Sequence, residues 1–473
     1  MAIPPSTKLQ GILAMYVMDI LLVKPLQNIN EIQPPLGLLY LAGNIKDICN
    51  VTVLDCIKEK INVKRFKKLI EETKYDVIGF QCYSMDMDVI KEMAENIKEI
   101  SPNTIIVVGG AQPSLDPINT LEYLEIVDYG FCGEAEESFR DFISSLKTGI
   151  GINEISGLVY KKFGKYVVNE VKRIENLDKF SIGWEFINLN SYPTVPHGAF
   201  YKQSPIAPLI ITRGCPFSCT FCGGTLIGGK KIRRHSVDYT IKQIEFLKEN
   251  YGIKEIHIED DNFTINREFV VDFCEKLIEK DLGITWAVPN GIRIDTLDEE
   301  LVKLMKKSGL YTVTFGVESG SDRVRKLMNK KLDTETVEKQ VRMIKKLDMN
   351  IVGAFMIGFP GETVKEIKET IKFSLDLPLD RAVYSIFKPL PGTEIYNQLK
   401  KDNQLGNLEW KNFSFYKVAW HPKEISKMRL INLRRWAFLR FYNRPRTMFK
   451  MIKDIRNFNN LKHITKRILR WMI

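Results

Sequence analysis

The chain of 473 residues has no uninterrupted apolar run long enough to cross a membrane, since a spanning helix needs about 20 apolar residues. Its early apolar stretch, Gly11–Val23, is interrupted by Asp19 and is followed by Lys24-Pro25 rather than by a small-residue cleavage site. A membrane span and a cleaved secretory signal are therefore both disfavoured. We expect a cytoplasmic protein.

Cysteine is too scarce for a disulfide framework, because the whole chain contains only eight. So few cysteines in a chain of this length fit a reducing compartment. Five of them are scattered singly, with no CxxC pair among them: Cys49, Cys56, Cys82, Cys132 and Cys274. We therefore expect no second metal cluster beyond the cysteine group described below.

Acidic residues are nearly missing from the end of the chain. Residues 421–473 contain 15 lysines and arginines but two acids, whereas residues 1–420 contain 54 basic and 56 acidic residues. The net charge of +11 therefore comes from this basic tail. Its interleaved basic and aromatic residues suit an anionic membrane surface. They could also follow a nucleic-acid backbone, or pack on the body of the protein.

Three cysteines, Cys215, Cys219 and Cys222, stand close together with CxxxCxxC spacing. They follow an apolar run at Pro208–Thr212 that predicts a buried strand. Thiolates at short spacing on a loop are the usual ligands of an iron–sulfur cluster, and three of them leave one iron of a [4Fe–4S] cluster open. Two alternatives remain: a zinc site that recruits His235 or Cys274, or three unrelated buried thiols.

Residues 18–145 alternate strand-like and helix-period segments, which predicts a doubly wound parallel sheet. The expected strands are Asp19–Lys24, Val51–Leu54, Asp76–Gln81, Thr104–Val108 and Ile126–Tyr129. Such sheets bind ligands at the carboxyl ends of their strands. Candidate binding residues at these ends are Pro34, Pro35, Gly37, Ser84, Gly109 and Gly110.

Residues 146–205 predict a β-hairpin turning at Phe163-Gly164 and then a connecting segment. Residues 206–400 again alternate strands and helices, in six β/α units with the cysteines after the first strand. Polar and glycine residues follow the later strands, where catalytic groups of β/α barrels lie. They are Glu259, Asp260, Asp261, Glu318, Ser319, Gly358 and Gly361. Residues 401–473 predict a basic α-helical extension.

The cysteine loop and the strand-end motifs in this order resemble the radical S-adenosylmethionine (SAM) enzymes that carry a cobalamin (B12)-binding domain. The resemblance covers the chain from the Pro34-Pro35-Leu-Gly37 stretch to Pro389-Leu-Pro-Gly392. It implies a partial (β/α)6 barrel behind a cobalamin-binding domain. It also implies three cofactors: a [4Fe–4S] cluster on the three cysteines, SAM at the open iron, and cobalamin.

The resemblance also assigns the remaining residues. Glu318 and Ser319 would contact the ribose and methionine parts of SAM, Gly358 to Gly361 the adenine side, and Phe221 the adenine itself. Glu259, Asp260 and Asp261 stand where many relatives carry a Gly-Gly-Glu that holds the SAM amino group, which is a departure from the family pattern. N-capping of a helix is an alternative role for Asp261.

In the first domain, Ser84, Gly109 and Gly110 would line the slot for the nucleotide tail of cobalamin, and Pro34, Pro35 and Gly37 would lie near the corrin. Many cobalamin domains present a histidine to cobalt, but the first 196 residues contain none. Either cobalt has no histidine ligand here, or the domain has lost cobalamin.

By resemblance, the expected activity is methylation of an unactivated carbon through a 5′-deoxyadenosyl radical and methylcobalamin. Three alternatives stay open: a non-methylating cyclase or oxidoreductase of the tetrapyrrole-cyclase type, a methylthiotransferase, and a non-catalytic cobalamin-binding module. The methylthiotransferase would need a second cluster, which the five scattered cysteines, with no CxxC pair among them, do not indicate.

The expected partners are a small-molecule or lipid-like substrate and an electron donor such as ferredoxin or flavodoxin. A peripheral membrane contact through residues 421–473 is a further expectation. No RNA-binding motif is present, so nucleic acid is disfavoured. An iron cluster with an open site predicts sensitivity to oxygen.

Overall fold

The structure is a computed structural model, and it describes residues 17–27, 32–149, 151–193 and 201–453, with the single positions 455, 461, 462 and 465. The chain forms two compact units. Unit 1 comprises Met1–Gln27, Pro35–Ile174 and Lys179–Asn188, and unit 2 comprises Asn28–Pro34, Glu175–Asp178 and Leu189–Ile473. No helix among the described residues is both long and apolar enough to span a membrane.

Unit 1 is built on a seven-stranded sheet with the order β2-β1-β3-β4-β5-β6-β7. Its parallel strands are β1 (Asp19–Lys24), β2 (Asn50–Asp55), β3 (Val77–Gln81), β4 (Ile105–Gly109) and β5 (Tyr129–Phe131). The connecting helices are α2 (Leu36–Ile45), α3 (Val63–Glu72), α4 (Met87–Ile100), α5 (Ala111–Leu115) and α6 (Pro117–Tyr123), and α7 (Glu136–Thr148) follows β5. The doubly wound parallel sheet is confirmed. Its order reverses between β1 and β3, the place where such sheets open a ligand crevice.

A hairpin of β6 (Leu158–Lys162) and β7 (Lys165–Val168) extends this sheet, because β6 pairs antiparallel with β5. The turn lies at Phe163-Gly164, as the sequence predicts. We expected the hairpin to belong to the connecting region, but it is part of the first sheet. The reason is burial, since Leu158 and Val159 are fully enclosed in the unit 1 core.

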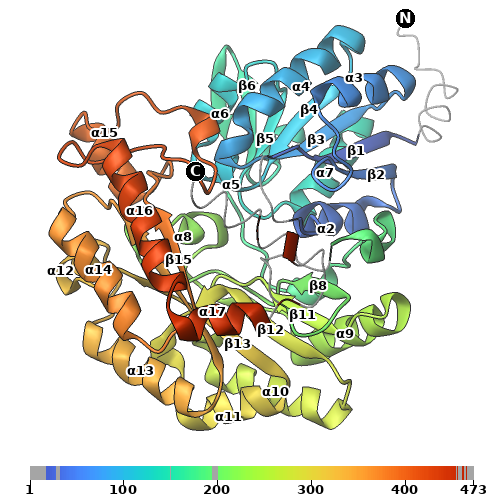
Figure 1. The fold of residues 1–473 in the computed structure, drawn as a ribbon. Coiled ribbons are helices and arrows are strands. Elements are labelled where there is room, and N and C mark those ends of the chain that lie inside the picture. Colours follow the sequence, from blue (N-terminus) through green and yellow to red (C-terminus); the bar gives the residue numbers. More distant parts are fainter. Residues whose placement is uncertain are drawn as a thin grey trace, which may run out of the picture. The chain divides into compact units, whose positions relative to one another are not determined.

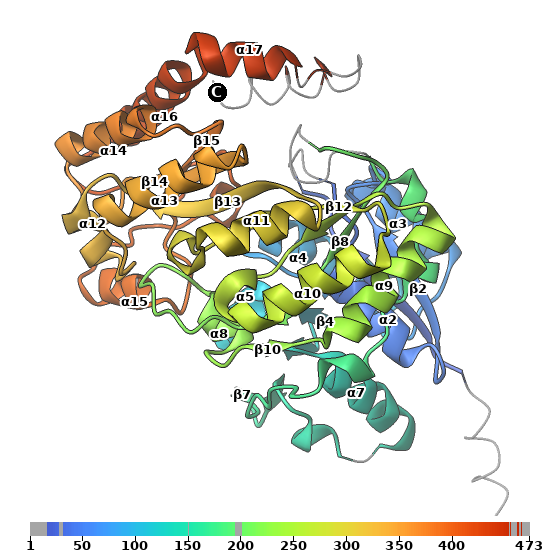
Figure 2. The same cartoon turned by 90° about the horizontal axis from the view of Figure 1, so that it is seen from below.

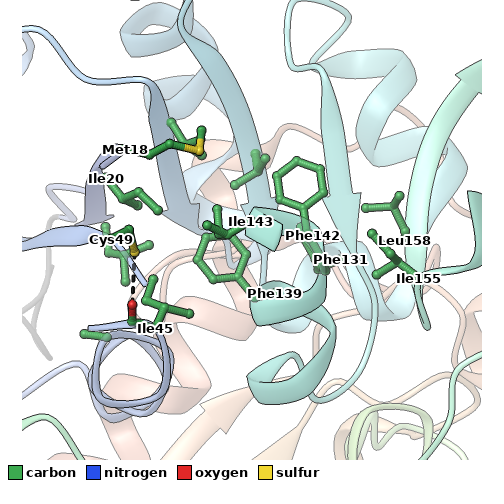
Figure 3. Packing of buried hydrophobic residues seen from close by; sticks show 14 of the residues in the cluster. Met18, Ile20, Ile45, Cys49, Phe131, Phe139, Phe142, Ile143, Ile155 and Leu158 are labelled. Atoms are coloured by element: carbon green, nitrogen blue, oxygen red, sulfur yellow. Dashed lines mark hydrogen bonds between the residues drawn. The ribbon is translucent and has the colours of Figure 1, made fainter. Parts of the chain in front are cut away.

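The core of unit 1 is dominated by aromatic rings from β5 and α7 (Figure 3). Phe131 makes edge-to-face contacts with Phe139 and Phe142, with ring centroids 5.6 and 5.4 Å apart. These rings pack against apolar side chains of β1, α2 and β6. A core of this size holds the sheet rigid, so the loops at its carboxyl edge have a fixed base.

Unit 2 is built on a six-stranded parallel sheet with the order β15-β14-β13-β12-β11-β8. Its strands are β8 (Ile206–Leu209), β11 (Glu255–Ile258), β12 (Thr285–Ile292), β13 (Leu310–Glu318), β14 (Asn350–Ile357) and β15 (Arg381–Ile386). Neighbours in the chain are neighbours in the sheet, as in a β/α barrel. The predicted partial barrel of six β/α units is confirmed.

The helices of unit 2 cover this sheet, and Figure 2 shows α9 (Val237–Tyr251), α10 (Arg267–Lys280) and α11 (Glu299–Lys307) side by side along it. They are followed by α12 (Asp322–Leu327), α13 (Thr334–Lys346), α14 (Val364–Asp376) and α15 (Glu394–Lys401). Most of these helices have an N-cap residue whose side chain accepts a hydrogen bond from a backbone N–H of the first turn, which would otherwise be unpaired. The caps of α9, α10, α11, α13 and α14 are Ser236, Asn266, Asp298, Asp333 and Thr363.

The basic extension contains α16 (Lys427–Tyr442) and α17 (Pro445–Lys453). α16 packs on β15 and α14 (Figure 1), and its buried residues include Phe438 and Phe441. Phe441 is fully buried, and the Tyr442 hydroxyl donates to the Ala382 carbonyl at 2.9 Å. This helix is therefore part of the barrel. The predicted tail beyond Lys453 lies outside the described residues, apart from four single positions.

Candidate functional site

The three cysteines lie on the loop that leads from β9 (Thr212–Arg213) to α8 (Gly224–Gly228). Cys215 and Cys219 are half-buried and Cys222 is exposed. Burial raises the pKa of Cys219, and the nearby Cys215 adds to this shift. Binding of a metal cluster would therefore have to displace thiol protons.

The start of this loop is fixed by a close backbone approach. Gly214 has φ +97°, and a Cβ at this position would collide with the Lys231 carbonyl and stand 3.1 Å from that of Gly229. The Cys215 N–H donates to the same Gly229 carbonyl at 3.0 Å. Only glycine allows this conformation without strain, so Gly214 sets the position of the first cysteine.

The middle of the loop is held by the segment that follows α12. The Thr220 N–H donates to the Met328 carbonyl at 3.0 Å, and the Asn329 side-chain amide donates to the Ser218 carbonyl at 2.7 Å. Asn329 adopts the left-handed conformation (φ +50°). The cysteine loop is thus braced by a distant segment of the chain, since Ser218 and Asn329 are 111 residues apart.

Arg293 joins the brace to the loop. Its guanidinium donates to the Lys330 and Lys331 carbonyls at 2.8 Å each, and it lies over the Phe217 ring with 4.0 Å to the centroid. Asp295 holds the same guanidinium through bonds of 2.9 and 2.6 Å. The sequence analysis did not identify Arg293, because nothing local to it indicates a contact with the cysteine loop.

The sequence analysis also missed Lys330. Its ammonium donates to Glu318 Oε1 at 2.8 Å, and both side chains are only 13% exposed. The nearby Cys219 also acts on Lys330, by raising the pKa of its ammonium. Glu318 has φ +66°, an uncommon conformation at the end of β13, and a Cβ at Gly316 would collide with its carboxylate. The fold therefore places one cation and one carboxylate beside the cysteines.

The zinc alternative has no support from the described residues. No three histidine, cysteine, aspartate or glutamate side chains among them stand close enough to hold one metal ion. His235 Nδ1 instead lies 3.0 Å from Asp178 Oδ1, and burial lowers the pKa of His235 to about 4. Cys274 is fully buried in α10. Neither of the two candidate fourth ligands, His235 and Cys274, therefore stands with the cysteines of the loop.

The three acidic residues after β11 differ in what they can reach. Asp260 is buried and accepts from the Ile211 and Thr212 N–H groups at 2.7 and 2.9 Å. Burial raises its pKa to about 7, although the two N–H donors oppose this shift. Its carboxylate is thus used to hold the strand exit. Asp261 is exposed beside α8, where a Cβ on Gly228 would stand 3.4 Å from its Oδ2, and Glu259 is half-buried.

The other residues expected to contact SAM lie at strand ends of the same sheet. The Ser319 hydroxyl is fully buried and lies 3.1 Å from that of Thr370. Gly358 and Gly361 have φ +78° and +77°. The ring of Phe221 packs edge-to-face against Phe359, with centroids 6.4 Å apart. The roles of these residues toward SAM stay predictions.

In unit 1 the expected cofactor residues lie at the carboxyl ends of β3 and β4. The Ser84 hydroxyl is buried and donates to Gln112 at 2.6 Å. Gly110 follows Gly109 with φ +108°, and a Cβ on it would stand 3.2 Å from the Cys82 carbonyl. Glycine is thus needed at position 110 for its close approach to the backbone of Cys82.

Pro35 and Gly37 lie at the start of α2, and Pro34 is assigned to unit 2. Pro34 and Pro35 are buried, whereas Gly37 is exposed and has no atom within 4 Å of a Cβ built on it. Their expected place beside the corrin stays a prediction.

Comparison with known families matches both units. The Radical SAM superfamily matches residues 209–374, and the B12 binding domain matches residues 25–143. The first range contains the cysteine loop, β11 to β14 and most of α14, and the second begins just after β1 and contains β2 to β5.

Individual relatives agree. An uncharacterized methyltransferase, PH0819 of Pyrococcus horikoshii, is 32% identical over 97% of this chain and 99% of its own length. Cytidylyl-2-hydroxyethylphosphonate methyltransferase of Streptomyces wedmorensis is 28% identical over 70% of this chain and 68% of its own. Among solved structures, the cobalamin-dependent SAM radical enzyme OxsB, with aqua-cobalamin and SAM bound, matches with a TM-score of 0.74 and 18% identity, covering 97% of this chain and 71% of that chain.

The OxsB likeness supports the fold alone, whereas PH0819 matches end to end above 30% identity. Both family matches fall on the units that carry the corresponding sites. The chain therefore belongs to the radical SAM enzymes that carry a B12-binding domain.

Proposed function

We propose that this enzyme is a cobalamin-dependent radical SAM methyltransferase that methylates an unactivated carbon of a small or hydrophobic substrate. The observation that carries the proposal is the three-cysteine loop, braced beside a Lys330–Glu318 pair, in a chain that also contains a complete B12-type sheet. The full-length match to a protein named as a methyltransferase supports the same reaction.

The residues present fit a [4Fe–4S] cluster with an open iron. Three thiols on one loop are its normal donor set. Lys330 and Arg293 are the cations that favour the thiolate form of Cys219, so positive charge is available to offset the negative cluster. When bound, the cluster supplies one electron to SAM and cobalamin supplies the methyl group, while the protein positions both.

The chain's own groups provide contacts of opposite charge for SAM. The ammonium of Lys330 can bind the SAM carboxylate, and a carboxylate oxygen of Glu318 can accept from a ribose hydroxyl. Glu259 or Asp261 can accept from the SAM ammonium, because the carboxylate of Asp260 already serves two backbone N–H groups. The adenine would lie along the turn from Gly358 to Gly361, where both glycines adopt the left-handed conformation.

Cobalamin would lie at the β1/β3 switch point, where the strand order reverses, with the Gly109-Gly110 turn at the carboxyl end of β4. None of the first 196 residues is a histidine, so this unit offers cobalt no imidazole ligand. The reductive step needs an external electron donor of the ferredoxin or flavodoxin type.

We also propose that the protein makes a peripheral contact with a membrane. In α17, Met448, Phe449 and Ile452 are 48%, 61% and 63% exposed, and Arg446 and Lys453 lie on the same short helix. Apolar side chains flanked by cations suit an anionic lipid surface. Co-sedimentation with phosphatidylserine vesicles, but not with phosphatidylcholine vesicles, would support this contact, and equal failure with both would remove it.

The test of the reaction is to identify SAM products by mass spectrometry, using anaerobically reconstituted protein and host extract with and without cobalamin. S-adenosylhomocysteine and 5′-deoxyadenosine, both raised by cobalamin, are the expected result. 5′-Deoxyadenosine alone would favour a cyclase-type reaction. Neither product from protein with an intact cluster would refute the proposal, and Cys219→Ala should abolish both.

A further inference from the structure

Lys388 lies two residues after β15, at the carboxyl end of the last barrel strand. Its side chain is partly buried. Within the part of the chain that the structure describes, its ammonium has neither a hydrogen-bond acceptor nor a carboxylate partner. This absence is unusual, because a buried charge without a partner is destabilising.

The other enclosed lysines of the chain show how the fold normally treats such a charge. Lys24 lies 3.5 Å from Asp55, Lys330 lies 2.8 Å from Glu318, and Lys345 lies 2.7 Å from Asp380. In each case a carboxylate from another part of the sequence meets the ammonium. Lys388 is the exception among them.

The surroundings of Lys388 add positive charge instead. Its ammonium lies 5.7 Å from the centroid of the Phe415 ring. Arg434 of α16 is buried, donates to the Tyr416 carbonyl at 3.0 Å, and repels Lys388. Arg435 in turn repels Arg434. Burial, and then the charge of Arg434, lower the pKa of Lys388 to about 8.

This cluster is connected to the cysteine loop through aromatic rings. Phe387, the neighbour of Lys388, packs against Phe359 with ring centroids 5.2 Å apart. Phe359 packs in turn against Phe221, between Cys219 and Cys222, at 6.4 Å. The unpaired lysine therefore belongs to the same end of the barrel as the candidate active site.

We propose that Lys388 and Arg434 form a binding site for an oxyanion of the carboxylate or phosphate class. An anion placed between the Lys388 ammonium and the Arg434 guanidinium would supply the counter-charge that Lys388 lacks among the described residues. The ligand is either an anionic group of the substrate or a free phosphate. Only the first of these sources rests on the proposed function.

The first test is trace acetylation of the full-length protein with acetic anhydride, which reacts with neutral amines. The label on the Lys388 peptide is quantified by mass spectrometry across pH. With a pKa of about 8, half of the Lys388 side chain is neutral at pH 8, about 100-fold more than for a lysine of ordinary pKa near 10.4. A bound anion that raises this pKa by about one unit would lower labelling at pH 8 about fivefold.

The comparison is between sodium phosphate and sodium chloride at equal ionic strength. Phosphate should protect Lys388 and leave the exposed Lys372 of α14 unaffected. Equal labelling of Lys388 in both salts would overturn the proposal. Equal protection of both lysines would also overturn it, because the effect would then be general.

If Lys388 is too enclosed to react at any pH, thermal unfolding decides instead. Phosphate should raise the Tm of the wild type and of Lys388→Arg, but not that of Lys388→Met, with Lys372→Met as the matched control. An equal rise in all four proteins would overturn the site.

The source of the anion is tested last, and separately from the site itself. If the substrate supplies it, methylation should depend on an extract fraction retained by an anion exchanger, and phosphate should inhibit it competitively. Methylation that phosphate leaves unchanged assigns the site to free phosphate. Failure of methylation altogether affects the proposed function and leaves the labelling and Tm results standing.

Discussion

Arg293→Met tests whether the cysteine loop is held in place by the brace after α12. The substitution keeps an extended side chain over the Phe217 ring but removes the guanidinium that bonds to two carbonyl groups. Because Arg293 is only 8% exposed, little water can replace those bonds. We expect lower stability and poorer cluster binding from this single change.

The magnitude follows from the contacts. Two charge-assisted bonds of about 1.5–3 kcal/mol each give a loss of about 3–6 kcal/mol. The cation–π contact with Phe217 adds about 1 kcal/mol. The pair with Asp295, whose side chain is 33% exposed, adds little after solvent screening. We expect a net loss of at least about 3 kcal/mol, the lower end of the hydrogen-bond contribution, because little water can reach the freed carbonyls.

Two assays measure this effect: chemical unfolding of the protein before reconstitution, and iron and sulfide bound per chain after anaerobic reconstitution. Arg267→Met is the matched control, since Arg267 pairs with Asp298 at 3.0 Å but is 49% exposed, and it should leave the free energy of unfolding nearly unchanged. If Arg293→Met has the same free energy of unfolding as the control and binds as much iron as the wild type, the brace does not hold the loop.

Four further results are expected. Cys219→Ser should lose most bound iron while its far-ultraviolet circular dichroism stays that of the wild type; normal iron content would remove Cys219 from the ligand set. Gly214→Ala should lower both stability and iron binding, because its Cβ would meet three carbonyl groups at a left-handed φ, and a stability equal to the wild type would contradict that crowding. Lys330→Met should weaken SAM binding in calorimetry more than Lys330→Arg, and equal affinities would exclude a role for its charge. Burial raises the pKa of Glu362 to about 8, so the stability from its protonated form is complete below about pH 4.5 and is lost as pH rises through 8; Glu362→Gln should flatten this decline in denaturant unfolding between pH 6 and 9, and an unchanged slope would contradict it.

The sequence predicted the strand and helix alternation of both units because hydrophobic periodicity and turn residues act locally. The six barrel strands and the turn at Phe163-Gly164 are examples. Its two errors concern one strand boundary and the placement of the hairpin. β5 begins at Tyr129, later than expected, because the Val127 N–H closes a turn on the Leu124 carbonyl. The hairpin joined the first sheet because its apolar residues had that core within reach.

The sequence by itself determined the fold class and the three cysteines, since CxxxCxxC spacing is contained in eight consecutive residues. Only the tertiary structure decided which charges meet them. Arg293 and Lys330 reach the cysteine loop because parallel strands bring their carboxyl ends to one edge of the sheet, whatever their separation along the chain. The same order gave Asp260 two backbone donors and placed Lys388 near Arg434, with no carboxylate partner for Lys388 among the described residues. Such pairings depend on strand order and side-chain packing, which no local pattern contains.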